Sequence, residues 1–339
     1  MRPLFPICFL KKHLFKPFFF RTSRTITGKW PLKLFFVAAL VLVSGSFAHT
    51  EIEYAPREPL ARRSLLLDGC VAGVRMLTVG ERGHILLSDD NGTSWRQANV
   101  PTVATLTGVF FENSRLGWAV GHDAVILKTL DGGINWSRVH YAPEQECPLL
   151  DVFFLDEKTG FAIGAYGLFL ETMDGGDTWS ARSISQDDWH LNHMAESAGG
   201  RLYIAAESGT IYRSDDKGKS WISLPSPYQG SFFGTLPLSN DALLLFGLRG
   251  NLFRSEDAGD SWSRITTNTE ATLTDGKKLA DGTIIVVGLA ATILVSRDGG
   301  RTFLMSQQAH RKGFSAVLQA TDNSVITVGE NGIKKINLK

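Results

Sequence analysis

The chain has 339 residues, a formal net charge of +1 and 43% hydrophobic side chains. Its charge is unevenly distributed, because residues 1–48 hold eight Lys or Arg residues and no acidic residue. Subtracting these eight positive charges from +1 leaves a formal charge of −7 for the rest of the chain. Nucleic-acid binding depends on clustered Lys and Arg, so this balance argues against a nucleic-acid partner.

The first 48 residues are predicted to be a basic leader with a secretory signal peptide. An apolar run at residues 34–43 follows the basic segment, and Ser46 and Ala48 are small residues of the kind found before a cleavage site. The run is short for a membrane span, although an uncleaved anchor stays open. We therefore expect an exported protein that is soluble in the periplasm after cleavage.

Residues 49–339 are predicted to form one domain, because a short phrase recurs there six times. Its pattern is Ser/Thr-x-Asp-x-Gly-x-x-Trp/Phe, first seen from Ser88 to Trp95. The final aromatic residues stand at positions 95, 136, 179, 221, 262 and 303, which are 41 to 43 residues apart. A fixed period near 40 residues indicates repeated propeller blades. The fold class is therefore all-β, and the phrase is the Asp-box of BNR repeats.

The Asp of each box is expected to be structural. Its carboxylate can accept hydrogen bonds from backbone N–H groups in a tight turn, while the Gly supplies the backbone freedom of that turn. A metal or catalytic role would need one copy rather than six. The predicted turn-capping residues are Asp90, Asp131, Asp174, Asp216, Asp257 and Asp298.

A second phrase predicts a hairpin turn between two strands, as in Val120-Gly121-His122-Asp123-Ala124. It occurs seven times, the last at residues 328–332, and so indicates seven blades. The last blade then lacks a fourth strand before the chain ends. Residues 51–54 resemble residues 139–142, which are predicted to be an outer strand. We expect 51–54 to complete the last blade and close the ring, which removes an unpaired edge.

The blade pattern resembles the photosystem II stability/assembly factor family of BNR-repeat propellers, which includes relatives in non-photosynthetic bacteria. The resemblance is clearest at residues 151–154, 160–164 and 174–179, and it covers essentially all of residues 51–339. It implies a seven-bladed, non-enzymatic factor outside the cytoplasm that binds a membrane-protein intermediate during assembly. The motifs are mostly structural, so the identity of the partner stays open.

A hydrolase of the sialidase type is the alternative, because Asp-boxes also occur in such enzymes. The segment that carries the first substrate-binding Arg in sialidases has no match near Arg57, and no nucleophile elbow or phosphate loop is present. Asp68, Asp151, Asp275 and His193 share one position at the start of an innermost strand, where side chains can face the central channel. A carboxylate pair or cation site is one interpretation, and polar groups that satisfy strand ends are the favoured one. We predict no catalytic residue, metal or cofactor.

Partner binding is predicted on the face that carries the hairpin turns and the connections between blades, since loops on a rigid scaffold carry recognition. Trp189 lies outside the box positions, and aromatic and Arg residues dominate binding hot spots. The candidate residues are Arg82, His122, Asp123, Tyr166, Asp187, Asp188, Trp189, His190, Tyr228 and Arg249.

The leading hypothesis is a monomeric, non-catalytic periplasmic scaffold that binds a membrane-associated polypeptide or complex as an assembly or stability factor. A glycan-binding or glycan-hydrolysing propeller is the second hypothesis. A purely structural subunit of an envelope complex is the third.

Overall fold

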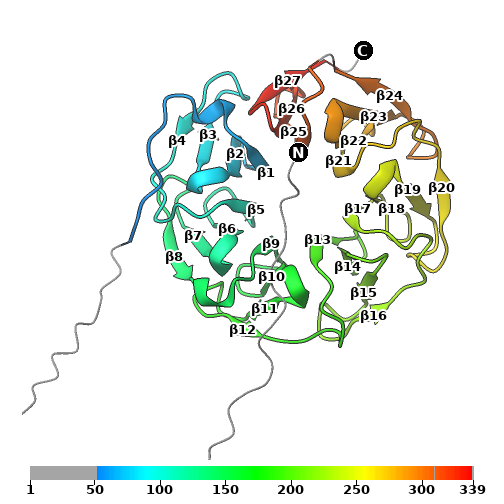
Figure 1. Ribbon diagram of the computed structural model, residues 1–339, viewed down its shortest axis with the longest axis horizontal. Helices are drawn as coiled ribbons and strands as arrows, with labels where there is room; N and C mark the ends of the chain where they lie inside the picture. Colours follow the sequence, from blue (N-terminus) through cyan, green and yellow to red (C-terminus); the bar gives the residue numbers. More distant parts are fainter. Residues whose placement is uncertain (1–51, 309, 338–339) are drawn as a thin grey trace, which may run out of the picture. The chain divides into compact units, whose positions relative to one another are not determined.

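The computed structural model describes residues 52–308 and 310–337. Seven antiparallel sheets surround a central channel in chain order, and no α-helix is present in these residues (Figure 1). This arrangement is the seven-bladed β-propeller that the two repeated phrases predict. No described helix is long and apolar enough to cross a membrane. The predicted leader, residues 1–48, lies outside the described residues.

The first strand of each blade lies nearest the channel and the last strand lies outermost. The blades are: blade 1, β1 (Leu66–Ala72), β2 (Arg75–Gly80), β3 (Ile85–Ser88) and β4 (Arg96–Gln97); blade 2, β5 (Leu106–Phe111), β6 (Gly117–Gly121), β7 (Ile126–Thr129) and β8 (Ser137–His140); blade 3, β9 (Leu149–Phe154), β10 (Gly160–Gly164), β11 (Phe169–Thr172) and β12 (Ser180–Ala181); blade 4, β13 (Leu191–Glu196), β14 (Leu202–Ala206), β15 (Ile211–Ser214) and β16 (Ile222–Ser223); blade 5, β17 (Phe232–Pro237), β18 (Leu243–Gly247), β19 (Leu252–Ser255) and β20 (Ser263–Ile265); blade 6, β21 (Leu273–Lys278), β22 (Ile284–Gly288), β23 (Thr292–Ser296) and β24 (Leu304–Gln307); and blade 7, β25 (Phe314–Gln319), β26 (Val325–Gly329) and β27 (Lys334–Ile336).

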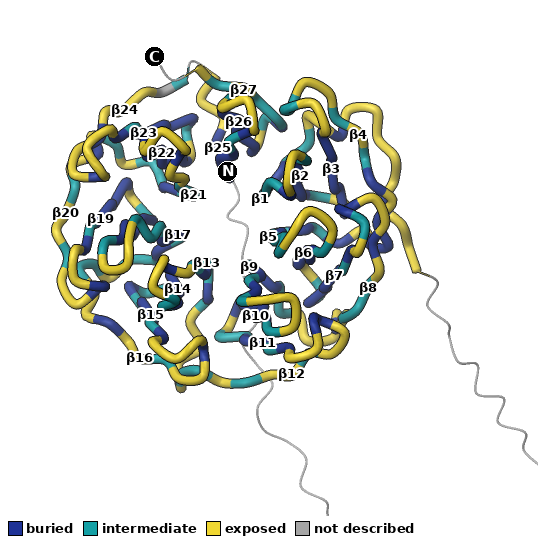
Figure 2. The backbone as a smooth tube through the Cα atoms, turned by 180° about the vertical axis from the view of Figure 1, so that it is seen from behind, coloured by how far each residue is buried: buried dark blue, intermediate teal, exposed yellow. Residues whose placement is uncertain are grey.

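The core is divided among the joints between neighbouring blades, and the strands within each blade are largely buried (dark blue in Figure 2). Each second strand is buried along its whole length except at Arg75, because its two faces pack on two blades. Trp118 of β6 is one example: its ring stacks on Phe154 of blade 3, with 3.4 Å between ring centroids. Burial on both faces explains why these strands read as continuous apolar runs.

The six Asp-boxes are turn caps, as predicted. In the first box, Asp90 accepts hydrogen bonds from the Ser88 and Ser94 hydroxyls and from the Ser94 backbone N–H, at 2.6–2.8 Å. The box glycine has a positive φ, which is 79° at Gly92. A side chain there would also collide with the preceding blade, since a Cβ on Gly176 would lie 2.5 Å from Trp118 Nε1. The box therefore shapes a turn and also fits it onto the neighbouring blade.

The hairpin turns and the connections between blades share one face, as predicted. The turn after each second strand donates a backbone hydrogen bond to the residue just before the first strand of its blade, as from His122 N to Thr105 O at 2.9 Å. Six of these turns are 3₁₀ turns or bends whose middle residue has a positive φ, namely Arg82, Asp123, Tyr166, Ser208, Arg249 and Ala290. The boxes bond instead to the turns between first and second strands, as from Gly175 N to Lys158 O. The hairpin face and the box face are therefore opposite.

The predicted closing strand is wrong for the residues that the structure describes. Residues 52–54 are in no strand, and blade 7 consists of three strands, β25, β26 and β27. The chain runs past the outer edge of blade 1 instead, where Ala55 N donates to Val100 O and Glu58 N donates to Gln97 Oε1. These two hydrogen bonds hold the segment at blade 1, despite its similarity in sequence to residues 139–142.

The ring closes through packing of blade 7 on blade 1 and through η1 (Ala61–Arg63). Ile333 N donates to Arg62 O at 3.1 Å, and the Thr321 hydroxyl donates to Asn91 Oδ1 at 2.8 Å. Leu66 and Val328 lie in one buried cluster across this joint. The connection before β1 therefore replaces the expected fourth strand as the closing element.

Candidate functional site

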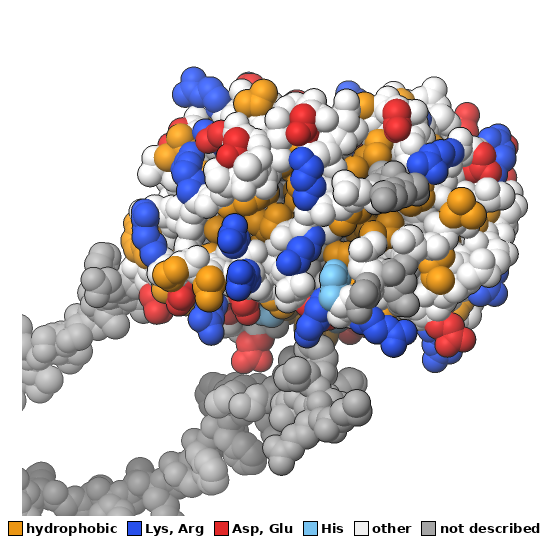
Figure 3. Space-filling view, turned by 90° about the horizontal axis from the view of Figure 1, so that it is seen from above, with side chains coloured by type: hydrophobic (Ala, Val, Ile, Leu, Met, Phe, Trp, Pro, Cys, Tyr) orange, Lys and Arg blue, Asp and Glu red, His pale blue; other side chains and the backbone are white. Residues whose placement is uncertain are grey.

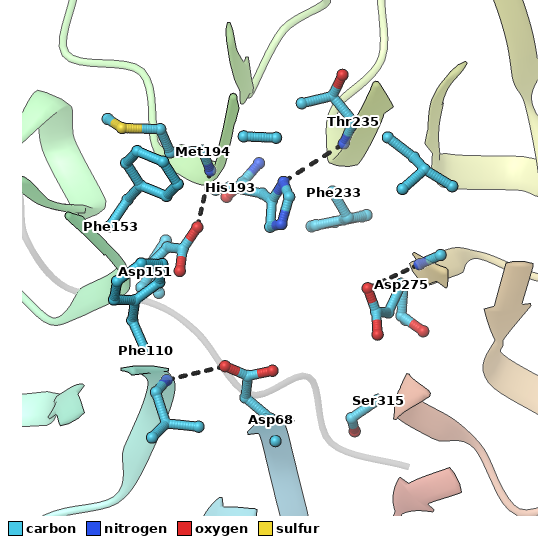
Figure 4. A pocket seen from close by; sticks show the side chains of 18 of the residues that line it. Asp68, Phe110, Asp151, Phe153, His193, Met194, Phe233, Thr235, Asp275 and Ser315 are labelled. Carbon is cyan, nitrogen blue, oxygen red and sulfur yellow. Dashed lines mark hydrogen bonds between the residues drawn. The ribbon is translucent and has the colours of Figure 1, made fainter. Parts of the chain in front are cut away.

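The central channel contains a ring of polar side chains, which we call the channel ring: Asp68, Asp151, His193 and Asp275 (Figure 4). They occupy one position of the first strands β1, β9, β13 and β21, as the sequence predicts. The equivalent positions of the other three blades hold small residues, Gly108, Gly234 and Ala316. The surrounding cavity has a volume of about 430 Å³.

Each first strand has a β-bulge at the ring position. The pairing of β1 with β2 shifts between Leu66 and Asp68, and the pairings in the other six blades shift at the same place. The first strand is also the edge strand of its sheet, so the N–H groups on its channel side have no strand partner. One such N–H group follows the ring position in each blade, and buried N–H groups need acceptors.

The channel ring supplies those acceptors. Asp151 Oδ1 accepts from Val152 N in its own blade, and Asp151 Oδ2 accepts from Met194 N in blade 4, at 2.8 and 2.7 Å. Asp275 joins Gly276 N of blade 6 and Val317 N of blade 7 in the same way. Asp68 binds Gly69 N and Val109 N, and His193 Nδ1 accepts from Thr235 N of blade 5 at 3.5 Å.

Four side chains therefore cap the backbone of all seven blades. Asp68, Asp151 and Asp275 each cap two neighbouring blades, and His193 caps blade 5. Blades 2, 5 and 7 therefore need no acceptor of their own and carry Gly or Ala at the ring position. This pattern supports the structural interpretation of these carboxylates, because each already accepts two backbone hydrogen bonds. Among the described residues, no group of three His, Cys, Asp or Glu side chains could hold a metal ion.

Burial raises the pKa values of the ring carboxyls. For Asp68, desolvation by burial, together with the carboxyl groups of Asp151 and Asp275, raises the pKa to about 8 against the opposing effect of its two backbone N–H donors. Burial is also the main cause of the raised pKa values of Asp151 and Asp275. The ring carboxyls line the channel cavity, and their residues are half-buried.

The raised pKa of Asp68 predicts a dependence of stability on pH. The folded chain retains a proton that the unfolded chain releases above about pH 4, so the free energy of unfolding falls as pH rises toward 8. Asp68→Asn keeps an acceptor but removes this titration, so its stability is expected to fall less across that range. Urea unfolding at pH 5, 6.5, 8 and 9 measures the two slopes, with Asp188→Asn on the surface as control. Equal slopes for wild type and Asp68→Asn would contradict a raised pKa.

Next to the ring, the channel wall becomes apolar. Phe110 and Phe153 approach to 5.2 Å between ring centroids, and Leu236 and Leu318 lie at equivalent positions. At the equivalent position of blade 6, Lys277 adds a positive charge to the channel wall. Among the described residues that line this cavity, Glu196 is the carboxylate outside the capped ring.

The predicted binding residues fall into four groups on the hairpin face. Arg82 lies 3.8 Å from Glu58, beside the chain that leads to blade 1. His122 and Asp123 form the η3 turn (His122–Ala124) of blade 2. Tyr228 and Arg249 line a groove on blade 5 together with Trp262 and Arg264. These groups are separate, so the ten residues do not form a single site.

The fourth group is compact, and with Glu207 it forms what we call the hairpin-face cluster: Tyr166, Trp189, His190 and Glu207. Tyr166 N donates to His190 Nδ1 at 3.1 Å, and the two rings meet edge to face at 4.9 Å. His190 N donates to Glu207 Oε2, and Gly167 N donates to Trp189 O. Tyr166 and Trp189 nevertheless remain 49% and 36% exposed. Asp187 and Asp188 are exposed beside them.

Sequence reasoning predicted Tyr166, Trp189 and His190 but not that they meet. Glu207 joins them from the hairpin of blade 4, at the position that Ala165 occupies in blade 3. The capping role of the ring was missed as a pattern. Its signal is visible in the sequence, because each Gly or Ala at this position of the repeat follows an Asp or His one blade earlier.

The fold and its regular boxes define a seven-bladed Asp-box β-propeller. A family model described as "Photosynthesis system II assembly factor YCF48" matches residues 87–147 and 140–288. The chain belongs to this family. No curated protein matches the sequence.

Solved structures share the fold at low sequence identity. "YCF48 bound to D1 peptide" is 18% identical with a TM-score of 0.67, covering 84% of this chain and 94% of that one. "YCF48 from Cyanidioschyzon merolae" is 17% identical with a TM-score of 0.65, covering 83% and 97%. A streptogramin B lyase is 16% identical with a TM-score of 0.65, covering 85% and 97%. An enzyme and a peptide-binding protein thus share one architecture, and only the residues can distinguish them.

Proposed function

We propose that this chain is a non-catalytic scaffold that binds a segment of a membrane-associated polypeptide while the complex of that polypeptide is assembled. Its membership of the assembly-factor family carries the proposal, and a structurally similar propeller is described as bound to a D1 peptide. We further propose that it acts after export, in the periplasm, and as a monomer. Its partner need not be a photosynthetic protein.

The hairpin-face cluster is the surface that we assign to this binding. Exposed aromatic side chains at fixed positions supply apolar contact area at a low entropic cost, and such residues are typical hot spots. Hydrogen bonds to His190 and to the carbonyl of Trp189 hold the two aromatic residues in place. The nearby Asp187, Asp188 and Glu207 favour a partner segment that carries Lys or Arg.

The test compares the membrane proteins that wild type and a Tyr166→Ala/Trp189→Ala variant recover from membranes. Loss of two hot-spot aromatics is expected to reduce recovery of the bound membrane protein by about thirtyfold or more, from roughly 2 kcal/mol or more of binding free energy. Tyr54→Ala, an exposed aromatic away from the cluster, is the control. Equal recovery by all three proteins would remove the cluster from the binding surface.

The glycan alternative has a separate test. A panel of glycoside substrates is expected to give no hydrolysis, because the channel carboxyls already cap backbone groups. Hydrolysis that Asp151→Asn or Asp275→Asn abolishes would overturn the non-catalytic proposal.

A further inference from the structure

Blade 7 has a free strand edge at the rim of the propeller. In each of the other six blades, the third strand pairs with an outer fourth strand, as Leu294 of β23 pairs with Met305 of β24. β27 pairs with β26 alone, through Val325 with Ile336 and Ile326 with Lys335. Its outer backbone N–H and C=O groups therefore have no strand partner among the described residues.

The register of β27 also differs from that of the other third strands. In blades 1 to 6, the residue just before the hairpin glycine (or before Ala206, its equivalent in blade 4) pairs with the residue six positions later, as Val79 pairs with Ile85. In blade 7, the same rule would pair Val328 with Lys334, but Lys334 pairs with Thr327. A strand held on one side only has a weakly specified register. β27 is thus the incomplete strand of an otherwise regular repeat.

Two cavities flank this edge. One has a volume of about 590 Å³ and is lined by Leu279, Val325, Ile336 and neighbouring polar residues. The other has a volume of about 240 Å³ and lies toward blade 1, beside Trp95 and Ile333. Both cavities border the free edge. The larger one, which Asp281 also lines, offers apolar surface to an added strand, whereas most of the smaller one is polar.

The surface around the edge is basic. The smaller cavity is lined by Arg62, Arg63, Lys334 and Lys335 and by no acidic residue. Arg62, Arg63 and Lys334 make no ion pair in the described part of the chain, and Lys335 approaches Asp322 only to 3.8 Å. Figure 3 looks onto the part of the rim that carries β27 and shows Lys and Arg side chains around exposed hydrophobic surface. An acidic strand would complement this charge.

The segments of this chain that could complete the blade fit poorly. Residues 55–58 are held at blade 1 by hydrogen bonds to Val100 O and to the Gln97 side chain. Residues 1–48 carry eight Lys or Arg residues and no acid, so like charges would oppose their binding beside Arg62 and Arg63. The charge therefore favours another polypeptide.

We propose that the outer edge of β27 binds an extended acidic segment of a partner polypeptide, which adds a fourth strand to blade 7. Addition of a strand to an exposed edge is an established mode of peptide recognition, in which backbone hydrogen bonds give affinity and side-chain contacts give specificity. Here the backbone of residues 334–336 supplies the hydrogen bonds, and Arg62 and Arg63 select acidic side chains. This surface lies at the rim, apart from the hairpin-face cluster, and does not depend on the function proposed for that cluster.

The test uses a fluorescent nonapeptide of alternating Glu and Val with a central Trp, at low ionic strength. Arg62→Glu/Arg63→Glu is expected to weaken its binding by about tenfold, as two exposed ion pairs change from attraction to repulsion. Arg115→Glu/Lys158→Glu, two exposed residues of blades 2 and 3, changes the net charge equally and is expected to bind like wild type. Tyr166→Ala/Trp189→Ala is also expected to bind normally, which separates this site from the hairpin-face cluster.

Hydrogen exchange supplies the second readout. The bound peptide is expected to slow exchange at amides of residues 334–336, and a peptide with N-methylated amides along one edge is expected not to bind. A second nonapeptide, in which Lys replaces every Glu, tests the charge preference. The proposal fails if this peptide binds as well as the Glu peptide, if exchange at β27 stays unchanged, or if the Glu peptide does not bind at all. It also fails if sedimentation shows a dimer through β27 that the peptide cannot dissociate, because a second copy would then be the occupant.

Discussion

Trp118→Ala is expected to lower the free energy of unfolding by about 3–5 kcal/mol, the range for removing a large buried aromatic side chain. Trp118 is fully buried, stacks on Phe154 and donates a hydrogen bond from Nε1 to Gly175 O in the Asp-box turn of blade 3. Its loss would leave a cavity at the joint between blades 2 and 3. It would also leave the carbonyl of Gly175 without this donor.

Urea unfolding followed by circular dichroism measures this effect. Trp118→Phe keeps much of the stacking but loses the hydrogen bond, so its stability is expected to lie between those of wild type and Trp118→Ala. Trp189→Ala, at a partly exposed position, is expected to change stability by less than about 1 kcal/mol. A loss at Trp118→Ala no larger than that of Trp189→Ala would show that the joint does not depend on this side chain.

Asp151→Ala is expected to lower the free energy of unfolding by about 2–5 kcal/mol, because it leaves two buried N–H groups without acceptors. These groups belong to Val152 in blade 3 and Met194 in blade 4. Asp151→Asn retains one acceptor oxygen, so it is expected to cost about half as much. A free energy of unfolding that falls in the order wild type, Asp151→Asn, Asp151→Ala would therefore indicate that lost hydrogen bonds, rather than lost charge, cause the destabilisation.

The same denaturation experiment distinguishes this cause from an electrostatic one. Burial raises the pKa of Asp151, so the ionised carboxylate is itself costly to hold in the channel. If charge dominated, Asp151→Asn would stabilise the fold relative to wild type. Such a result would contradict the capping role that we assign to the ring.

The sequence predicted the parts of the fold that repeat. Trp95 and its five equivalents revealed the period, and the seven hairpin phrases gave the number of blades. The faces followed from the position of each phrase within a blade. These predictions succeeded because each depends on contacts within one repeat or between identical neighbours.

The predictions that failed or stayed incomplete concern features without a repeat. Residues 51–54 resemble an outer strand, but the described residues after them pair with Val100 and Gln97, and nothing in the local sequence indicates that partner. The capping role of Asp151 depends on an N–H group 43 residues away in the next blade. The hairpin-face cluster likewise could not be predicted, because it depends on how Tyr166 and His190 are placed in neighbouring blades.

The distribution of the channel-wall hydrogen bonds has a mechanical consequence. Bonds from ring residues, or from Thr107, Asn192 and Thr274 just before the ring position, cross the joints 1/2, 2/3, 3/4, 4/5 and 6/7. Among the described residues, none of these side chains crosses the channel wall at the joints 5/6 and 7/1. The channel-wall bonds therefore form two continuous runs, one over five blades and one over two. The joints 5/6 and 7/1 rely instead on hydrogen bonds outside the channel wall, such as Arg254 Nε to Gly299 O and the Thr321 hydroxyl to Asn91 Oδ1. Strand addition at β27 would act on blade 7, directly beside a joint at which one run ends.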